Sequence, residues 1–450
     1  MTSTARSRVP EPLVILSGCI LLAAAASWIL PAGEFDRRED EATGRMVVVA
    51  GSYHTVERTP VGPFEAVVAL PLGMADAADV IFLVFLIGGA FTVVDASGTL
   101  GRATAGLARA LSGRDILVIP IVSLFFAVGG ATENMAEEIV ALVPVLLVLA
   151  ARVGFTPLVA VAMSAGAASV AAAFSPVNPF QVLVAQGVAD VPLRSGWAFR
   201  TLFLLIALAA WIGVTMRHAA RTRGARQAVD DATGDRLEGR DGVVLALVAA
   251  TFAIVVWGLA VWGWDFNRLS AAFFIMGVAV GLVSRMGVAG TAAAYARGFR
   301  DMAYAAILIG FARAIYVVLD QGHVVDTIVY GMFLPIEGLP RLVSAVGMLV
   351  AHAAIHVPVP SVSGQAVLTM PLLVPLSDLL ELSRQVTVLA YQYGAGLCDL
   401  VTPTNGALMA VLAAAGVRYD RWLAFVLPLY LGLMALGAVA VAVAIAVGLT

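Results

Sequence analysis

Long apolar runs follow one another from near residue 12 to the end of the chain. A helix of about 20 apolar residues, rising ~1.5 Å per residue, crosses the ~30 Å hydrocarbon core of a bilayer. The pattern therefore predicts an all-α polytopic membrane protein with about nine full crossings. We expect these at about 12–31, 79–97, 156–188, 198–216, 243–263, 269–284, 303–319, 386–416 and 422–449.

Two pairs of apolar runs are too short to cross. The first pair, 115–129 and 136–151, is separated by "GATEN", and the second, 341–356 and 364–380, by "VPVPSVSG". A run of about 15 residues rises only ~22 Å, which reaches the middle of a bilayer and not its far side. Each pair therefore predicts a re-entrant hairpin. The first has Arg at its outer ends and the second has acidic residues, so we expect them to enter from opposite sides.

Two of the predicted crossings are interrupted by a Pro-containing stretch with an Asn. "SPVNP" (175–179) breaks the run 156–188, and "TPTNG" (402–406) breaks the run 386–416. Proline removes a backbone donor, and unpaired backbone in lipid costs several kcal/mol. Such breaks therefore occur where protein, water, an ion or a substrate satisfies the backbone. The alternative is a simple Pro kink whose Asn bonds to a neighbouring helix.

The two broken runs and the two hairpins form a repeat. Aligning Asn178 with Asn405 also aligns Pro144 with Pro371. Two halves with the same order of elements and opposite orientation form an inverted repeat, which is typical of transporters with binding sites near the bilayer midplane. The predicted organisation is a cytoplasmic tail 1–11, a first half 12–216 with hairpin 115–151, a polar cytoplasmic linker 217–242, and a second half 243–450 with hairpin 341–380.

Composition and charge agree with this prediction. Hydrophobic residues make up 61% of the chain and charged residues 13%, against about 25% charged residues in ordinary soluble domains. The net charge of -3 does not suggest a nucleic-acid partner. Arg6 and Arg8 place the N-terminus in the cytoplasm under the positive-inside rule, and we expect a multi-pass protein of the bacterial inner membrane. The two cysteines are isolated, which indicates neither a disulfide framework nor a metal site.

Four stretches resemble a known family: "ILPAGEFDR", "GSYHTVERTPVGPFEA", "GATENMAEEIVALVPVLLVLA" and "AAFSPVNPFQVLVAQ". They are similar to the YfcC-type carriers, in the C4-dicarboxylate and basic amino-acid carrier group of the ion-transporter superfamily. The resemblance implies a secondary transporter, often a homodimer, that works by elevator-like motion. It also implies that substrate and coupling ions lie between hairpin tips and broken helices, at Thr132, Glu133, Asn134, Ser175, Asn178, Ser361, Ser363, Gly364, Gln365, Thr402, Thr404 and Asn405. The "SNT" triplets of better-known dicarboxylate members are absent, so substrate and ion stay open.

Charged residues inside the apolar runs are further candidates, because intramembrane charges are costly and usually functional. Glu133 and Glu137 lie one helical turn apart at the first hairpin tip and could carry a coupling proton or face a cationic substrate. The alternative is pairing with an Arg or capping of the second arm. Arg313 and Asp399 could pair with each other. Otherwise Arg313 grips a substrate carboxylate and Asp399 binds an ion.

Two other classes of protein compete with a transporter. "HAAIH" (352–356) has the His spacing of zinc proteases, and Asp399 could serve as a third ligand. However, Ala353 occupies the position of the general base. An ion channel is the other alternative. We expect a transporter and not an enzyme, moving a small organic acid or amino acid, with no cofactor and with Na⁺ or H⁺ as a possible coupling ion.

Overall fold

The computed structural model describes residues 11–40, 44–110, 114–224, 239–336 and 339–449, and these are mostly helical. Within these ranges nine helical segments are long and apolar enough to cross a membrane. The prediction of an all-α polytopic membrane protein is thus confirmed. Two of the nine belong to the expected hairpins. All nine segments are Pro12–Ile29, Ala78–Ala96, Asp115–Glu133, Trp197–Thr222, Gly239–Leu259, Phe266–Val283, Gly287–Gln321, Val362–Leu379 and Tyr419–Ala446.

The first pair of short runs forms two helices joined by a tight turn. They are α5 (Val118–Glu133) and α6 (Glu137–Val153). Asn134 ends α5 in the left-handed conformation, with φ 57°, and its N–H donates to the carbonyl of Gly130 over 3.1 Å. Asparagine tolerates this conformation better than most residues. The chain can therefore reverse within three residues, where "GATEN" predicted a turn.

The second pair forms α15 (Arg341–Ile355) and α16 (Val362–Leu379). The linking residues 356–361 include two prolines, which prevent α15 from continuing. Ser361 caps α16, since its Oγ accepts a hydrogen bond from the N–H of Gly364 over 3.2 Å. Both predicted hairpins are thus present as helix pairs near the predicted boundaries.

Both broken runs are interrupted where the sequence predicts. The first contains α7 (Pro157–Val161), a π-helical turn (Ala162–Gly166) and α8 (Ala167–Ala173), and after the break a second π-helical turn (Pro179–Leu183) and α9 (Val184–Val188). The second contains α17 (Arg384–Cys398) and α18 (Gly406–Ala414). Asn178 and Asn405 are the N-caps of the segments that follow each break, in line with the strong preference of Asn for this position.

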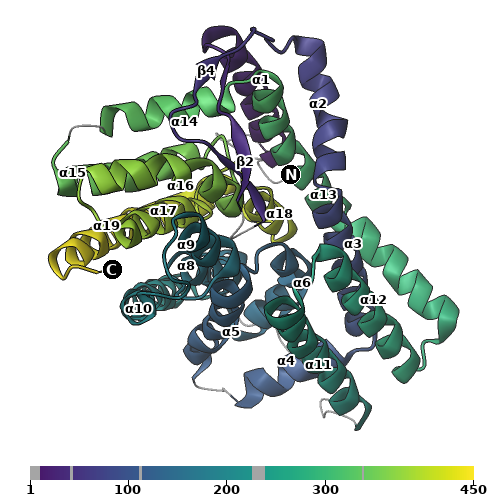
Figure 1. Cartoon of the computed structure of the whole chain (residues 1–450). Coiled ribbons are helices and arrows are strands. Elements are labelled where there is room, and N and C mark those ends of the chain that lie inside the picture. Colours follow the sequence, from purple (N-terminus) through teal and green to yellow (C-terminus); the bar gives the residue numbers. More distant parts are fainter. Residues whose placement is uncertain (1–10, 41–43, 111–113, 225–238, 337–338, 450) are drawn as a thin grey trace.

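The two halves pack reciprocally. The first hairpin arm packs on the first part of the broken helix in each half, α5 on α8 and α15 on α17. The second arms also reach across to the opposite half, α6 to α18 and α16 to α9. Figure 1 shows the second-half helices α15, α16 and α17 above α8, α9 and α5. This exchange of partners is what an inverted repeat predicts.

Two glycines permit the close contacts within each half. A Cβ on Gly130 would lie 2.2 Å from the carbonyl oxygen of Ala168, where α5 meets α8. A Cβ on Gly394 would lie 2.3 Å from the carbonyl oxygen of Leu349, where α17 meets α15. Backbones in membrane proteins approach this closely through small residues.

A second group of helices surrounds the 35-residue α13 (Gly287–Gln321), which packs against α1 (Pro12–Ile29), α2 (Pro63–Asp76), α3 (Ala78–Ala96) and α18. The predicted run 303–319 is only part of α13, because its first turns are more polar. Helix α2 was not expected. The other members of the fold are α4 (Thr99–Ala110), α10 (Trp197–Thr222), α11 (Gly239–Trp262), α12 (Phe266–Val283), α14 (Val325–Phe333) and α19 (Tyr419–Ala446).

The predicted polar linker, 217–242, lies where α10 is followed by α11. Helix α10 continues to Thr222 and α11 begins at Gly239, so both ends of the predicted linker are helical. Residues 225–238, and residues 1–10 of the predicted tail, lie outside the described residues.

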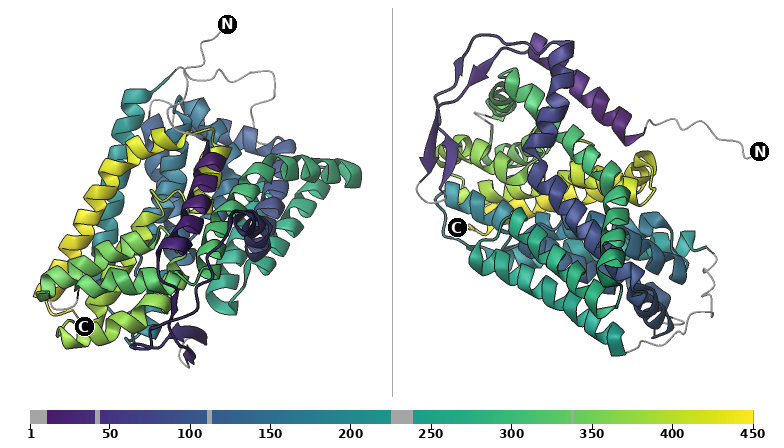
Figure 2. Two further views of the ribbon diagram at one scale, coloured as in Figure 1. Left: turned by 90° about the horizontal axis from the view of Figure 1, so that it is seen from above. Right: turned by 90° about the vertical axis from the view of Figure 1, so that its right-hand side faces the viewer.

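The segment after α1 forms two short β-ribbons, which the apolar pattern did not predict. They pair β1 (Gly33–Glu34) with β4 (His54–Thr55), and β2 (Arg37–Asp40) with β3 (Arg45–Val48). Figure 2 shows these strands along one edge of the molecule, and β3 packs against α16. Asp326 of α14 anchors them: it accepts two hydrogen bonds from Arg37 and one from the N–H of Phe35, each of 2.9 Å.

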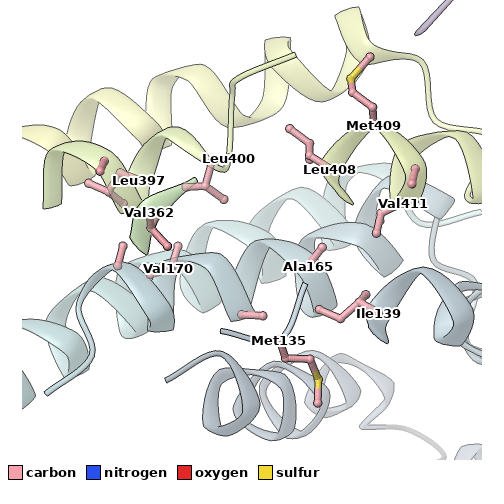
Figure 3. Close-up of a cluster of buried hydrophobic side chains, with 14 of the residues drawn as sticks. Met135, Ile139, Ala165, Val170, Val362, Leu397, Leu400, Leu408, Met409 and Val411 are labelled. Atoms are coloured by element: carbon pink, nitrogen blue, oxygen red, sulfur yellow. The ribbon is translucent and has the colours of Figure 1, made fainter. Parts of the chain in front are cut away.

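The core between the halves is an apolar layer. Figure 3 shows side chains of α16, α17 and α18 facing those of α6, α8 and the turn between α5 and α6. This layer packs the two halves together beside the breaks. The labelled members are Met135, Ile139, Ala165, Val170, Val362, Leu397, Leu400, Leu408 and Val411, while Met409 points away from the first half.

Candidate functional site

The first break is closed by hydrogen bonds from Asn178, whose side chain is fully buried. Its Oδ1 accepts from the N–H groups of Phe180 and Gln181 over 2.9 and 3.0 Å. Its Nδ2 donates to the carbonyl of Gly130, at the end of α5, over 3.0 Å. Asn178 therefore binds the first hairpin to the first broken helix, as the alternative of an Asn bonded to a neighbouring helix predicted.

Ser175 and its neighbours connect this break to the second half. The Ser175 hydroxyl donates to the carbonyl of Ala131 over 2.6 Å, and its own carbonyl accepts from Nε2 of Gln392, on α17, over 2.7 Å. Gln392 in turn accepts a 2.9 Å hydrogen bond from the buried Arg200 of α10. The backbone freed by the first break is thus satisfied by protein groups, and the two halves are joined there.

The second break repeats one of these contacts. Thr404 donates from Oγ1 to the carbonyl of Val357 over 2.7 Å. In the alignment of Asn178 with Asn405, Val357 corresponds to Gly130. The carbonyl at this position of each hairpin tip therefore accepts a hydrogen bond from the break in the same half, from Asn178 in the first half and from Thr404 in the second. Asn405 accepts from the N–H of Leu408 over 3.0 Å and donates to Oδ1 of Asp399 over 2.6 Å.

A line of polar side chains leads from Asp399 to the second hairpin. His356 lies with Nε2 2.9 Å from Asp399 Oδ1 and with Nδ1 3.0 Å from Oε1 of Gln365. Gln365 Nε2 lies 3.0 Å from Nδ1 of His352 and 2.9 Å from its carbonyl oxygen. The other members of this line, His356, Gln365 and His352, are fully buried.

A cavity of about 410 Å³ lies between the two hairpin tips, the second break, and helices α2, α3 and α13. Its walls are strongly charged. Six carboxylate side chains face two guanidinium groups, one of which is Arg45 from β3. The carboxylates belong to Asp76, Asp79, Glu133, Glu137, Glu138 and Asp399, and the second guanidinium to Arg313.

The structure brings most of the sequence-predicted residues together at this cavity. Its lining includes Glu133, Asn134, Glu137, Arg313, Ser361, Ser363, Asp399, Thr404 and Asn405. The others lie elsewhere: Ser175, Asn178, Gln365 and Thr402 are buried behind the wall, Thr132 bonds to the carbonyl of Val128, and Gly364 lines a neighbouring cavity of about 200 Å³ beneath β2 and β3.

Two arrangements considered from the sequence do not occur. Arg313 forms its ion pair with Asp76, at the end of α2, and not with Asp399. Asp399 instead bonds to His356 and Asn405. Glu133 and Glu137 do not share a helical face either, because the α5–α6 turn separates them, although both line the cavity.

Sequence reasoning missed several cavity residues. Asp76 and Asp79 interrupt the apolar stretch between residues 63 and 96, which was a usable signal. Glu138 directly follows the predicted Glu137, and it also caps its own helix by accepting from the N–H of Ala136 over 3.2 Å. Arg45 gave no signal, because a residue in the polar segment between two spans reaches the cavity only through the fold of the β-ribbon.

The zinc-protease alternative does not match the structure. Gln365 separates His352 from His356, and no three His, Cys, Asp or Glu side chains of the described ranges are grouped as metal ligands.

Comparison with known proteins identifies the family. The model of the C4-dicarboxylate anaerobic carrier family matches residues 9–446. The chain belongs to this family. It is therefore a multi-pass membrane transporter and not an enzyme.

This chain is similar to two known proteins along almost their whole lengths. It is 33% identical to the "putative basic amino acid antiporter YfcC" of Escherichia coli, covering 93% of each chain. It is 26% identical to an uncharacterized protein of Haemophilus influenzae, covering 96% of each. Among solved structures, the YdaH transporter of Alcanivorax borkumensis is 18% identical with a TM-score of 0.46, covering 98% of this chain and 99% of that one.

Proposed function

We propose that this protein is a secondary active transporter that carries a small amino acid or organic acid by exchange or ion coupling, and that its substrate is a cationic amino acid. The observation that supports this most directly is the charged cavity of about 410 Å³ between the hairpin tips and the second break. Its volume falls in the usual range of small-molecule sites, about 300–1,000 Å³.

The charge of the cavity favours a cation. Six carboxylates and two guanidinium groups line it, and Arg313 is already paired with Asp76. Glu133 Oε1 is buried and has no hydrogen-bond partner among the described residues. A buried carboxylate oxygen without a partner is costly, and an ammonium or guanidinium group of a substrate would satisfy it. Arg45 is left to bind the α-carboxylate.

The relatives support the same class of substrate. The family is named for C4-dicarboxylates, whereas the Escherichia coli relative is named a putative basic amino acid antiporter. A dicarboxylate in this cavity would face an excess of negative charge, which costs free energy at short range. The cavity therefore favours the basic amino acid.

We also propose an elevator-like motion. The two hairpins, the two broken helices, α10 and α19 would move together against α1, α2, α3, α11, α12 and α13. The cavity lies between these two groups, so a relative displacement would carry it across the bilayer. The division into halves 12–216 and 243–450, the inner-membrane location, the cytoplasmic N-terminus and a homodimeric state belong to the same proposal. They are supported by the Arg distribution and by the family resemblance.

Counterflow in liposomes tests the function. Purified protein is reconstituted with unlabelled arginine, lysine, succinate or malate inside, and uptake of the same labelled compound is measured at equal pH on both sides. We expect saturable exchange of arginine or lysine. Glu137→Gln should lose most of it, because the substitution removes a cavity carboxylate. Glu57→Gln, the same substitution at an exposed loop position, should exchange like wild type.

The outcomes separate the possibilities. Exchange of succinate or malate without any amino acid would refute the substrate class. Ohmic current far above carrier turnover would indicate a channel and refute secondary transport. Equal loss in Glu137→Gln and Glu57→Gln would show that the cavity is not the site.

A further inference from the structure

The line of side chains from His352 to Asp399 joins a fully buried imidazole to the cavity wall. His356 has no exposed surface, while the side chain of Asp399 retains 16% exposure and lines the cavity. The hydrogen bonds in this line determine which ring nitrogen of His356 carries a hydrogen. They do so through the amide of Gln365, which lies between the two histidines.

The backbone fixes the orientation of that amide. The Gln365 atom that lies 2.9 Å from the carbonyl oxygen of His352 has to be the nitrogen, since two oxygens would repel at that distance. The amide oxygen therefore faces Nδ1 of His356 at 3.0 Å. An oxygen can only accept, so Nδ1 of His356 carries a hydrogen.

This assignment leaves Nε2 of His356 without a hydrogen whenever the imidazole is neutral. Nε2 lies 2.9 Å from Oδ1 of Asp399, and an ionised carboxylate has no hydrogen to donate. Two lone pairs would then face each other at hydrogen-bond distance. The contact requires one additional proton, either on Nε2 of His356 or on Oδ1 of Asp399.

We propose that His356 and Asp399 together bind the proton that this transporter exchanges for its substrate, an inference that rests on the proposed function. The proton passes between the pair and water in the cavity: the protonated pair gives a proton to water and becomes a neutral imidazole beside a carboxylate. Asp399 then loses its bond to His356 and keeps the 2.6 Å bond from Asn405 Nδ2. The protonation state is thereby transmitted to the N-cap of α18.

Water can reach the pair from the side of Asp399. Besides the large cavity, Asp399 borders a void of about 30 Å³ whose other walls include Asn134 and Asn405. That volume is about the share of one water molecule in the liquid. Asp399 can therefore exchange a proton while His356 stays shielded.

The surrounding charges make the proton and a cationic substrate competitors. On the buried side the pair is near Cys398, Tyr391 and His352, whose Nδ1 accepts from Gln365. Across the cavity it faces more negative than positive groups, so one added cation, proton or substrate, is favoured. The facing groups are Glu133, Glu137, Glu138, Asp76 and Asp79, with Arg45 and Arg313.

Calorimetry of arginine binding to the full-length protein tests this site. Titrations at several pH values, in buffers of different ionisation enthalpy, count the protons released on binding. Wild type should release up to one proton per arginine, and its affinity should fall by up to tenfold per pH unit on the acid side. In His356→Gln the release should disappear and the affinity should become nearly independent of pH. His54→Gln, the same substitution in an exposed strand, should behave like wild type.

A second measurement uses wild type alone, so that it does not depend on folding of the variant. A pH gradient imposed across liposomes should drive arginine accumulation. If counterflow at equal pH proceeds but a gradient drives nothing, the proton site is overturned and the transporter proposal stands. Unchanged pH dependence in His356→Gln would overturn it as well. Absence of counterflow for every substrate would instead overturn the proposed function.

Discussion

Replacing Asn178 with alanine tests whether the first break is a structural joint. The substitution removes both acceptor bonds to the N–H groups of Phe180 and Gln181, and the 3.0 Å donor bond to Gly130. Loss of an N-cap costs about 1 kcal/mol, and each buried group left unpaired costs about 1–3 kcal/mol. The carbonyl of Gly130 keeps one partner, the N–H of Asn134. We therefore expect a loss of about 3 kcal/mol.

The aligned position provides the matched control. Asn405→Ala removes one capping bond, to Leu408, and the bond to Asp399. Asn405 lines the cavity, so water can replace both partners and the stability loss should be about 1 kcal/mol or less. We expect Asn405→Ala to stop exchange with little loss of stability. Asn178→Ala should mainly lower the melting temperature, and any loss of exchange should follow from that.

Thermal unfolding of the detergent-purified variants measures the difference. For a chain of this size the expected losses correspond to a fall of roughly 3 °C for Asn178→Ala and at most about 1 °C for Asn405→Ala. Counterflow is measured on the same preparations. A melting temperature of Asn178→Ala equal to that of wild type, or a larger fall in Asn405→Ala, would refute the assignment of these two roles.

Three further predictions concern other parts of the structure. Gly130→Ala would place a Cβ 2.2 Å from the carbonyl oxygen of Ala168, and should cost about 1–3 kcal/mol by separating α5 from α8, measured by thermal unfolding. Asp326→Asn weakens the two bonds from Arg37 that hold the ribbon of β2 and β3, so amide hydrogen exchange in residues 37–40 and 45–48 should become roughly fivefold faster, as about 1 kcal/mol predicts; unchanged exchange would show that the pair does not hold the ribbon. Asp76→Asn removes one negative charge from the cavity and should weaken arginine binding about fivefold in calorimetry, whereas tighter binding would contradict a cationic substrate.

The apolar pattern alone determined the all-α membrane class, both hairpins and both breaks. Their signals are local: apolar length sets what can cross, and Pro with Asn sets where a helix stops and restarts. The repeat also follows from sequence, since Asn178 and Asn405 align and both prove to be N-caps. The pattern did not reveal α2, because its apolar run is only 14 residues long and contains Pro71. It did not reveal the β-ribbons either, because a polar segment between spans has no constraint of length or periodicity.

Tertiary structure alone decided which polar residues meet. Asn178 and Asn405 occupy equivalent positions, yet one is buried among backbone groups and the other lines a cavity. Arg313 pairs with Asp76, and His356 meets Asp399, because helices distant in the chain pack side by side. Such pairings depend on distances of a few ångströms between side chains, and spacing along the chain does not encode them.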